Sequence, residues 1–389
     1  MKSFQKKVDK AHSFSGILLL TVTILILIVF VGCKKEITAL PGEQKSEKNN
    51  NGLNESEQNA DIRVHSGGSI QAAVDAASPG SIIMIDPGIY EEAIVVDKPG
   101  IRLIGAHTGV IIQNPGDEEN GITVSDKGDG FVLKNVTVKN FEENGVLLDH
   151  VDGFLLSHVT ATDNGEYGLF PSFCTNGVVD HCEASGHSDT GIYVGQSSNV
   201  VMSFNTAFAN VNGLEVENSK DVIVSHNESF NNSAGIAIIL LPGLEVKSGS
   251  DILVFKNNIY NNNLPNFAPP GGGFESFIPA GIGILILGVD HTTISQNTIS
   301  DNDFVGVGTV STQVLGALAG LPPEAFADIE PNPDGTRVEK NELNNNGSAP
   351  PEGFPFPGVD LLWDGSGTDN CWMKNSFNTS YPSPLPACK

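Results

Sequence analysis

The sequence predicts an all-β chain that forms a right-handed parallel β-helix with a short N-terminal capping helix. One asparagine-rich phrase returns at a regular interval, so that Asn205 is followed 22 residues later by Asn227 in the same context. Short runs such as "GIYV" and "GLEV" have the period of a strand with one buried face. A repeat of this length is typical of a solenoid whose stacked coils share one core.

Two rows of positions carry the repeat. Asparagine tolerates the left-handed backbone of a tight turn, and its amide can bond to the equivalent amide one coil away. We therefore expect stacked asparagines at two corners of a coil that has three short strands. The first row is Val136, Val159, Cys182, Asn205, Asn227, Asn257, Asn297, Asn341 and Asn375, and the second row is Asn164, His187, Asn210, Asn232, Asn262, Asn302 and Asn346.

The folded domain is predicted over residues 62–389. Its first part, "GSIQAAVDAAS" (68–78), has apolar residues at helical spacing. A short helix there can cover the open end of the solenoid.

Residues 1–32 are predicted to be a signal peptide. Lysines precede an apolar run over 16–31, and Gly32 stands directly before Cys33. The pattern resembles a bacterial lipoprotein signal, in which the cysteine is lipidated after cleavage. An uncleaved membrane anchor is the alternative, because the run approaches spanning length. We expect an exported protein that Cys33 anchors to the cell membrane or outer membrane, facing the periplasm or the cell surface.

Residues 33–61 lack apolar periodicity and are predicted to be a flexible tether between the anchor and the folded domain. The formal net charge of −25 disfavours nucleic acid as a partner, because phosphate binding needs Lys and Arg. We expect a monomer.

Four cysteines follow Cys33. An even number in an exported chain favours disulfides. We predict the local pairs Cys174–Cys182 and Cys371–Cys388. The chain has no cysteine and histidine spacing of the kind that binds zinc, and we predict no metal site and no cofactor. A divalent cation such as calcium stays open as an alternative.

The segment "PGSIIMIDPGIYEEAIVVDKPGIRLIGAHTGVIIQN" resembles the first coils of pectin-lyase-like β-helix proteins, and the resemblance extends to about residue 375. The stretches "GHSDTGIYVGQSSN" and "NNNLPNFAPPGGG" are similar to an uncharacterised group of bacterial parallel β-helix repeat lipoproteins. The resemblance implies a polysaccharide or another extended glycan as ligand, since the wider group includes pectate lyases, polygalacturonases and polyuronate epimerases. A shared fold does not by itself determine function.

Insertions interrupt the repeat at the two corners that flank one strand column. They should form walls on both sides of a trough whose floor is that column. The apolar part of this floor can alternatively be covered by the insertions themselves. The four predicted insertions are 241–250, 263–281, 311–334 and 347–357.

The acidic part of the predicted floor holds the candidate site. Glu215 and Glu217 lie two residues apart on one strand face, which separates them by roughly 6–7 Å. Such a pair can act as acid and base on a glycosidic bond. His187 and Asp189 are expected one coil earlier as further catalytic residues. Tyr193 and Asp360 are predicted ligand-binding residues on the floor. The alternative is a solvated acidic face with one histidine in the asparagine row.

Two further outward rows are candidates for ligand contact. Phe208, Phe230 and Tyr260 form an aromatic row that can stack sugar rings or pack against one another. His158, His181 and His226 precede the first asparagine row and can bind a metal or an anionic chain, although Phe204 interrupts them. Polar residues at tight turns are the simpler explanation.

Three functional hypotheses follow. The protein either processes a polysaccharide as a lyase, epimerase or glycoside hydrolase, binds it without cleavage, or serves as a structural and partner-docking surface. "EYGLFPSF" (166–173) resembles the epimerase motif Tyr-Gly-x-Asp-Pro, but Phe170 occupies the place of the aspartate, and the histidine of the motif is missing. The predicted trough also has no outward Lys or Arg pair for a lyase, and the paired aspartates of polygalacturonases are absent.

Overall fold

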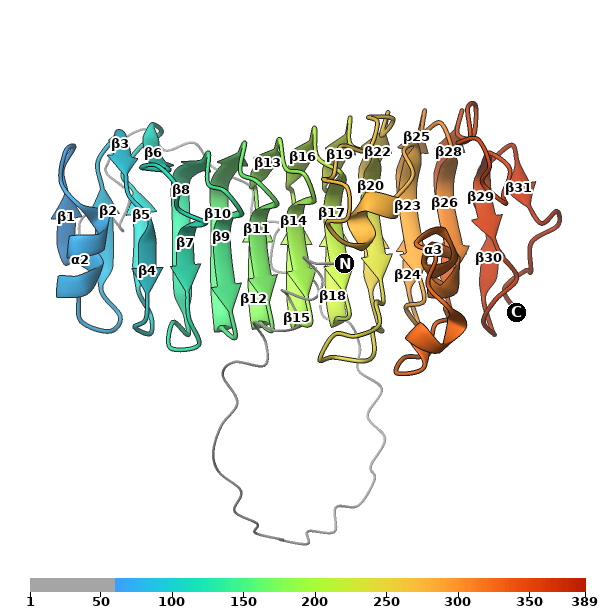
Figure 1. The fold of residues 1–389 in the computed structure, drawn as a ribbon, viewed down its shortest axis with the longest axis horizontal. Helices are drawn as coiled ribbons and strands as arrows, with labels where there is room; N and C mark the ends of the chain where they lie inside the picture. The colour runs from blue at the N-terminus through green and yellow to red at the C-terminus, as the bar shows by residue number, and fades with distance from the viewer. Residues whose placement is uncertain (1–59) are drawn as a thin grey trace, which may run out of the picture.

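The computed structural model describes residues 60–389. The predicted signal peptide, Cys33 and nearly all of the predicted tether lie outside the described residues. Figure 1 shows one elongated stack of coils that runs from β1 (Ile62–Val64) at the blue end to β31 (Ser380–Tyr381) at the red end. Within the described part of the chain, no helix is both long and apolar enough to cross a membrane.

Parallel strands stack into three columns, which confirms the predicted three-stranded coil. The first column consists of β1, β2 (Ile82–Ile85), β5 (Arg102–Gly105), the first half of β8 (Phe131–Lys139), the first half of β10 (Asp152–Thr162), β12 (Thr175–Asp180), β15 (Ser198–Ser203), β18 (Lys220–Ser225), β21 (Leu253–Phe255), β24 (Thr293–Ser295), β27 (Arg337–Glu339) and β30 (Cys371–Met373). The second column consists of β3 (Gly88–Glu91), β6 (Val110–Gln113), the second halves of β8 and β10, β13 (Glu183–Ser185), β16 (Thr206–Phe208), β19 (Glu228–Phe230), β22 (Asn258–Tyr260), β25 (Thr298–Ser300) and β28 (Glu342–Asn344). The third column consists of β4 (Ile94–Val96), β7 (Asn120–Val124), β9 (Asn144–Asp149), β11 (Tyr167–Ser172), β14 (Thr190–Gly195), β17 (Asn212–Glu217), β20 (Ala234–Ile239), β23 (Ile282–Leu287), β26 (Val305–Val310), β29 (Val359–Trp363) and β31.

Alternation along each strand separates the core from the outer faces. In β17, Leu214 and Val216 are buried in the main core inside the stack. Glu215 and Glu217 therefore belong to the opposite face of the same strand, as the sequence predicts.

Both asparagine rows form hydrogen-bonded ladders at the coil corners. Asn205 donates its side-chain amide to Asn227 Oδ1 at 3.0 Å, and Asn210 donates to Asn232 Oδ1 at 3.1 Å. The residue before each first-row member turns the corner with a left-handed backbone, as at Phe204 with φ 57°. The ladders satisfy polar groups that the turns bury, which explains the repeat.

The predicted capping helix is present at the first coil. It is α2 (Ile70–Ala76), which begins after Ser69, and the Ser69 hydroxyl accepts the Ala72 N–H at 3.0 Å. Ile70 and Val74 are buried against the first coils and close the N-terminal end of the core.

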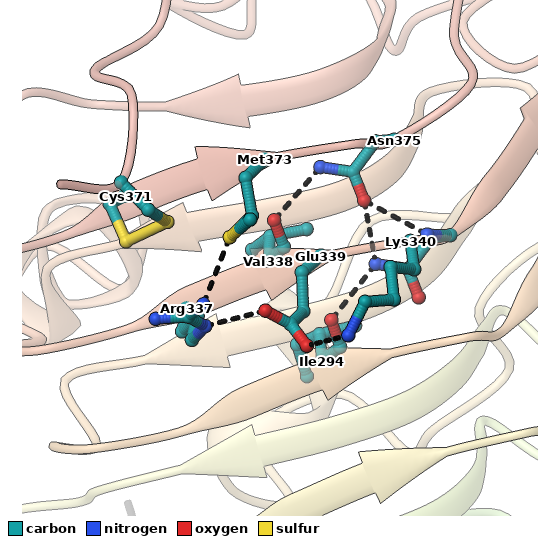
Figure 2. A network of polar contacts seen from close by, with 10 residues as sticks. Ile294, Arg337, Val338, Glu339, Lys340, Cys371, Met373 and Asn375 are labelled. Atoms are coloured by element: carbon teal, nitrogen blue, oxygen red, sulfur yellow. Dashed lines mark hydrogen bonds and ion pairs between the residues drawn. A yellow bond between two sulfur atoms is a disulfide. The ribbon is translucent and has the colours of Figure 1, made fainter.

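Polar contacts complete the last coils (Figure 2). Asn375 is the last amide of the first ladder and donates to the Val338 carbonyl oxygen at 2.8 Å. On the outer face of the neighbouring strand, the Glu339 carboxylate pairs with Arg337 at 2.6 Å and with Lys340 at 2.7 Å.

The cysteines differ from the prediction. Cys371 and Cys388 are joined by a disulfide, but Cys174 and Cys182 are free and buried, so the predicted Cys174–Cys182 bond is wrong. The extended strand β12 lies between these two cysteines and holds them roughly 20 Å apart, whereas a disulfide needs Cα atoms within about 7 Å. Burial raises the pKa of both thiols to about 12.

The four insertions lie beside the third column. They contain the short helices η3 (Phe274–Phe277), α3 (Thr312–Leu318) and η4 (Pro323–Phe326). Figure 1 shows α3 in front of the C-terminal strands of this column. Lys247 of the first insertion pairs with Asp328 of the third at 2.6 Å, which joins the two insertions to each other.

Candidate functional site

The outer face of the third column has two halves of different character. In the N-terminal half, which we define as β7, β9, β11, β14 and β17, outward residues are polar or aromatic apart from Leu147, and several are partly exposed. In the C-terminal half, β20, β23, β26 and β29, they are apolar and covered by insertions. We call these the open half and the covered half.

An aromatic cluster forms the floor of the open half. Phe170 stacks on Tyr167 with ring centroids 4.2 Å apart, and its ring lies 4.5 Å from that of Tyr193. Phe170 is half-buried, whereas both tyrosines are buried. The Tyr193 ring lies over Gly195, where a Cβ atom would overlap with it. The glycine therefore makes room for the ring, and the Tyr193 hydroxyl donates to Glu217 Oε1 at 2.6 Å.

Glu215 lies beside this cluster but is not exposed. Its side chain is 4% exposed and accepts hydrogen bonds from the Thr190 hydroxyl and from Asn212 Nδ2, the latter at 3.1 Å. Glu215 and Tyr193 thus lie on the predicted outward row of the third column, but both side chains are buried there. They bond to and pack against residues of the third column itself, and Glu275 of the insertion 263–281 is near enough to raise the pKa of Glu215.

Several carboxylates gather at this point. Burial raises the pKa of the Glu215 carboxyl well above its usual value, and the neighbouring Asp189 and Glu217 carboxylates raise it further. Burial also raises the pKa of Tyr167, with Asp189 as the largest charge contribution. The structure thus brings together three of the four predicted catalytic residues, Asp189, Glu215 and Glu217. Glu215 is the one of the three whose pKa is raised by its burial.

His187 does not belong to this site. It is fully buried in the second ladder, where Nδ1 lies 2.8 Å from Asn210 Oδ1 and Nε2 lies 3.3 Å from Asn164 Nδ2. Burial lowers its pKa to about 4. The predicted catalytic role is wrong because the side chain faces the interior as a substitute for asparagine.

Asp360 is a second ladder residue. The sequence analysis aligned Asp360 with Gly308, but in the structure Leu362 of β29 pairs with Gly308. The predicted register of this strand was therefore wrong by two residues. The buried Asp360 carboxylate accepts the Asn346 side-chain amide at 2.9 Å and closes the second ladder. The predicted ligand-binding role of Asp360 is therefore wrong.

Three contributors to the site were missed by the sequence analysis. Thr190 and Asn212 are paired in one outward row at the start of their strands, each directly before a strand-opening glycine. The position before the strand-opening glycine is polar or aromatic in the open half and apolar from Ala234 onward. This change along the repeat is visible in the sequence and could have identified Thr190 and Asn212. Glu275 in η3 raises the pKa of Glu215. Because Glu275 belongs to an insertion, its place in the structure could not be inferred from the spacing of the repeat.

The covered half is a second hydrophobic core. Leu285 and Leu362 from the column pack with Phe274, Ile278 and Leu315 from the insertions. The alternative that insertions cover the apolar floor is therefore correct for this half.

The predicted aromatic row on the second column has its ring faces occupied. Phe208 stacks on Phe230 at 5.3 Å, and Phe230 stacks on Tyr260 at 5.2 Å, with interplanar angles of 9° and 6°. The Tyr260 hydroxyl also donates to Glu228 at 2.9 Å. Because the rings cover one another, only their edges and the two end faces are free to meet a sugar.

The histidine stripe is likewise a stack along one corner. His158 and His181 are parallel at 4.9 Å, and Phe204 continues the stack to His181 at 5.1 Å and to His226 at 4.8 Å. Phe204 thus joins the row and does not interrupt it. Over residues 60–389, no group of three or more His, Cys, Asp or Glu side chains has the arrangement of a metal site.

Comparison with known proteins supports the fold. A family model described as "Right handed beta helix region" matches residues 120–263, and no curated protein matches the chain. The A-module of the mannuronan C-5 epimerase AlgE6 from Azotobacter vinelandii is similar, with 16% identity, coverage of 80% of this chain and 94% of that chain, and a TM-score of 0.58. The AlgE4 A-module from the same organism has 17% identity, coverage of 85% and 100%, and a TM-score of 0.52.

A third similar structure is DFA-IIIase from Arthrobacter chlorophenolicus A6 without its lid, in complex with GF2. It has 11% identity, coverage of 84% of this chain and 98% of that chain, and a TM-score of 0.53. Identities this low establish the fold alone. The chain has the fold of a right-handed parallel β-helix.

Proposed function

We propose that the protein binds an extended neutral glycan along the open half of the third column. The observation that carries this proposal is that Tyr193 joins two half-buried side chains of the open half, since its ring packs against Phe170 and its hydroxyl donates to the Glu217 carboxylate. Ligand sites commonly combine an apolar surface with a few placed polar groups. A ring packs against the apolar face of a sugar, and a carboxylate accepts hydrogen bonds from its hydroxyls.

The charge of the site favours a neutral glycan over a polyuronate. Glu217 and the exposed Asp149 lie on this face, and the charge of Glu275 also raises the pKa of Glu215. The whole chain carries −25. A ligand with its own carboxylates meets repulsion on this face.

A panel of neutral and uronic-acid oligosaccharides tests this function. We expect binding of a neutral oligosaccharide, and Glu217→Gln should weaken it because the amide accepts only at one atom. Ser300→Ala on the second column is the matched control and should bind as the wild type does. Binding confined to uronic-acid chains, or equal affinity of Glu217→Gln and wild type, would contradict the proposal.

An enzymatic role is the second candidate, favoured by the raised pKa of Glu215 in the strand that also carries Glu217. A carboxyl group with a raised pKa is suited to act as a general acid, and a neighbouring carboxylate can act as the base. Because Glu215 is buried, a conformational change has to expose its carboxyl before it contacts a substrate. Product analysis on the bound glycan decides this: turnover that Glu215→Gln removes supports an enzyme, and unchanged glycan supports a binding protein.

We also propose that Cys33 carries a lipid that anchors the exported domain to a membrane. The motif before Cys33 and the tether after it support this proposal. Cys33→Ser should release the protein from the membrane fraction. If membrane association and processing of the variant are unchanged, the lipoprotein hypothesis is wrong and the segment before Cys33 acts as an uncleaved membrane anchor.

A further inference from the structure

The segment 376–389 closes the C-terminal end of the stack, and we call it the closing segment. It accepts one backbone hydrogen bond from a late strand of each column, β28, β29 and β30. The donors are the N–H groups of Leu343, Leu361 and Trp372, and the distances are 2.8, 3.2 and 2.8 Å. The closing segment therefore occupies the edges of all three sheets at this end.

Side chains hold the closing segment against the core. Leu385 packs on the main core, to which the buried Trp372 belongs. The buried Asp360 carboxylate accepts the Asn378 N–H at 2.9 Å and the Thr379 N–H at 3.1 Å. Without the segment, core residues of the last coils and this carboxylate would meet water.

A disulfide fixes the far end of the closing segment (Figure 2). Cys388 is bonded to Cys371 of β30, and the two cysteines are 17 residues apart in sequence. Both are half-buried and therefore partly accessible to a reductant, whereas the thiols of Cys174 and Cys182 are buried and already free. Reduction of the described chain thus changes the covalent structure at the closing segment.

The N-terminal end of the stack is closed without a covalent bond. The Glu92 carboxylate accepts the N–H groups of Ile70 and Gln71 at the start of α2, at 2.6 and 3.1 Å. Lys98 donates to the Asp75 carbonyl oxygen near the end of the same helix, at 2.7 Å. A reductant leaves these contacts unchanged, so of the two ends of the described stack only the C-terminal one is sensitive to reduction.

We propose that the Cys371–Cys388 disulfide is a redox-sensitive latch, and that its reduction frees three sheet edges to bind a second copy of this chain. A dithiol reductant supplies two electrons and two protons. The S–S bond breaks, each cysteine becomes a thiol, and the dithiol closes to its own disulfide. This device is independent of the proposed glycan binding, because it lies at the end of the stack and uses no residue of the open half.

The contacts of the closing segment indicate what binds to the freed edges. Their present partner is extended backbone, in which Pro382, Pro384 and Pro386 have no N–H with which to bind a further strand. Once the segment leaves, β28, β29 and β30 expose unpaired backbone groups that can pair with another sheet edge. A second copy presents the same three edges, and two such ends can meet about a two-fold axis. Because α2 keeps the N-terminal end closed, we expect the assembly to stop at a dimer.

Co-purification of two differently tagged forms of the chain tests the interface. Both forms carry Cys33→Ser, which should remove the lipid, and they are mixed with or without dithiothreitol. We expect no association of the oxidised forms, and after reduction an association that cross-linking identifies as a dimer. Cys371→Ser combined with Cys388→Ser should associate without the reductant. Cys174→Ala combined with Cys182→Ala is the matched control and should behave as the wild type.

Hydrogen exchange at low protein concentration tests the latch itself. Reduction should speed exchange of the Leu343, Leu361 and Trp372 amides about 100-fold, the effect expected for releasing a loop closed over 17 residues. The amides of β17 are the internal control and should keep their rates. Unchanged exchange at the three amides would overturn the latch. Faster exchange without association at high concentration would overturn the interface, and growth beyond two copies would overturn the dimer.

Discussion

The open and covered halves of the third column share one backbone and differ only in what faces outward. Glu215 and Ala237 are direct partners in neighbouring strands, yet one belongs to a carboxylate site and the other to a hydrophobic core. Inside the stack, both halves continue the same apolar core and the same ladder. The difference teaches that the inward residues specify the solenoid, whereas the outward residues and the insertions specify what the surface binds.

The largest predicted effect is a difference in unfolding free energy between leucine-to-alanine substitutions in the two halves. Leu285→Ala removes a leucine that the insertions bury and should cost about 2–5 kcal/mol of unfolding free energy. Leu147 occupies the outward row of the open half and is only half-buried, so Leu147→Ala should cost clearly less. Urea denaturation measures both. Equal losses would show that the halves are not differently covered.

The next effect concerns the ladder below the open half. The pKa of His187 is lowered to about 4, so its folded form resists protonation. As the pH falls from 6.5 toward 4, the unfolded state gains the proton first, and the wild type should lose about 3 kcal/mol of stability. His187→Asn restores the ladder residue and should remove this loss while keeping stability at pH 7. Denaturation curves across this pH range, with both proteins in parallel, check the difference. Identical pH profiles would contradict the interior position of His187.

Glu215→Gln should have a smaller effect on stability, and the pH dependence should run the other way, because here the wild type loses stability as the pH rises. The folded-state pKa of Glu215 is raised, so the stability that it contributes is present below the unfolded value of 4.5 and is lost as the pH rises above it. The glutamine variant lacks that loss, so at pH 7 it should melt at an equal or higher temperature than the wild type. The difference should disappear below pH 4.5. A variant that melts lower at pH 7 would mean that Glu215 is ionised and stabilised in the folded protein.

The sequence predicted the β-helix, both ladders and the capping helix because each depends on local, repeated signals. The places of Asn205 and Gly213 within their coil follow directly from turn geometry and from the spacing of the repeat. Burial of Glu215 could not be predicted, since it depends on tertiary packing around the column, which the spacing of the repeat does not specify. The role of Asp360 was missed because the insertion before β29 obscures a shift of two residues in the register of the repeat.

The histidine in the second ladder was misassigned for a different reason. A lone His187 at an asparagine position was compatible with catalysis and with the ladder, and only the contacts to Asn164 and Asn210 distinguish the two. The Cys174–Cys182 pairing failed because proximity in sequence is not proximity across an extended strand.

The most direct test compares one aromatic residue from the open half with one from the second column. Affinity for the neutral oligosaccharide found in the panel is measured by calorimetry for wild type, Phe170→Ala and Phe230→Ala. Both rings are half-buried between aromatic partners, but Phe170 lies in the open half against Tyr167 and Tyr193, whereas Phe230 lies on the second column between Phe208 and Tyr260. We predict that Phe170→Ala weakens binding about tenfold or more, and that Phe230→Ala stays within about twofold. A strong loss in Phe230→Ala with no change in Phe170→Ala would place the ligand on the second column and contradict the account.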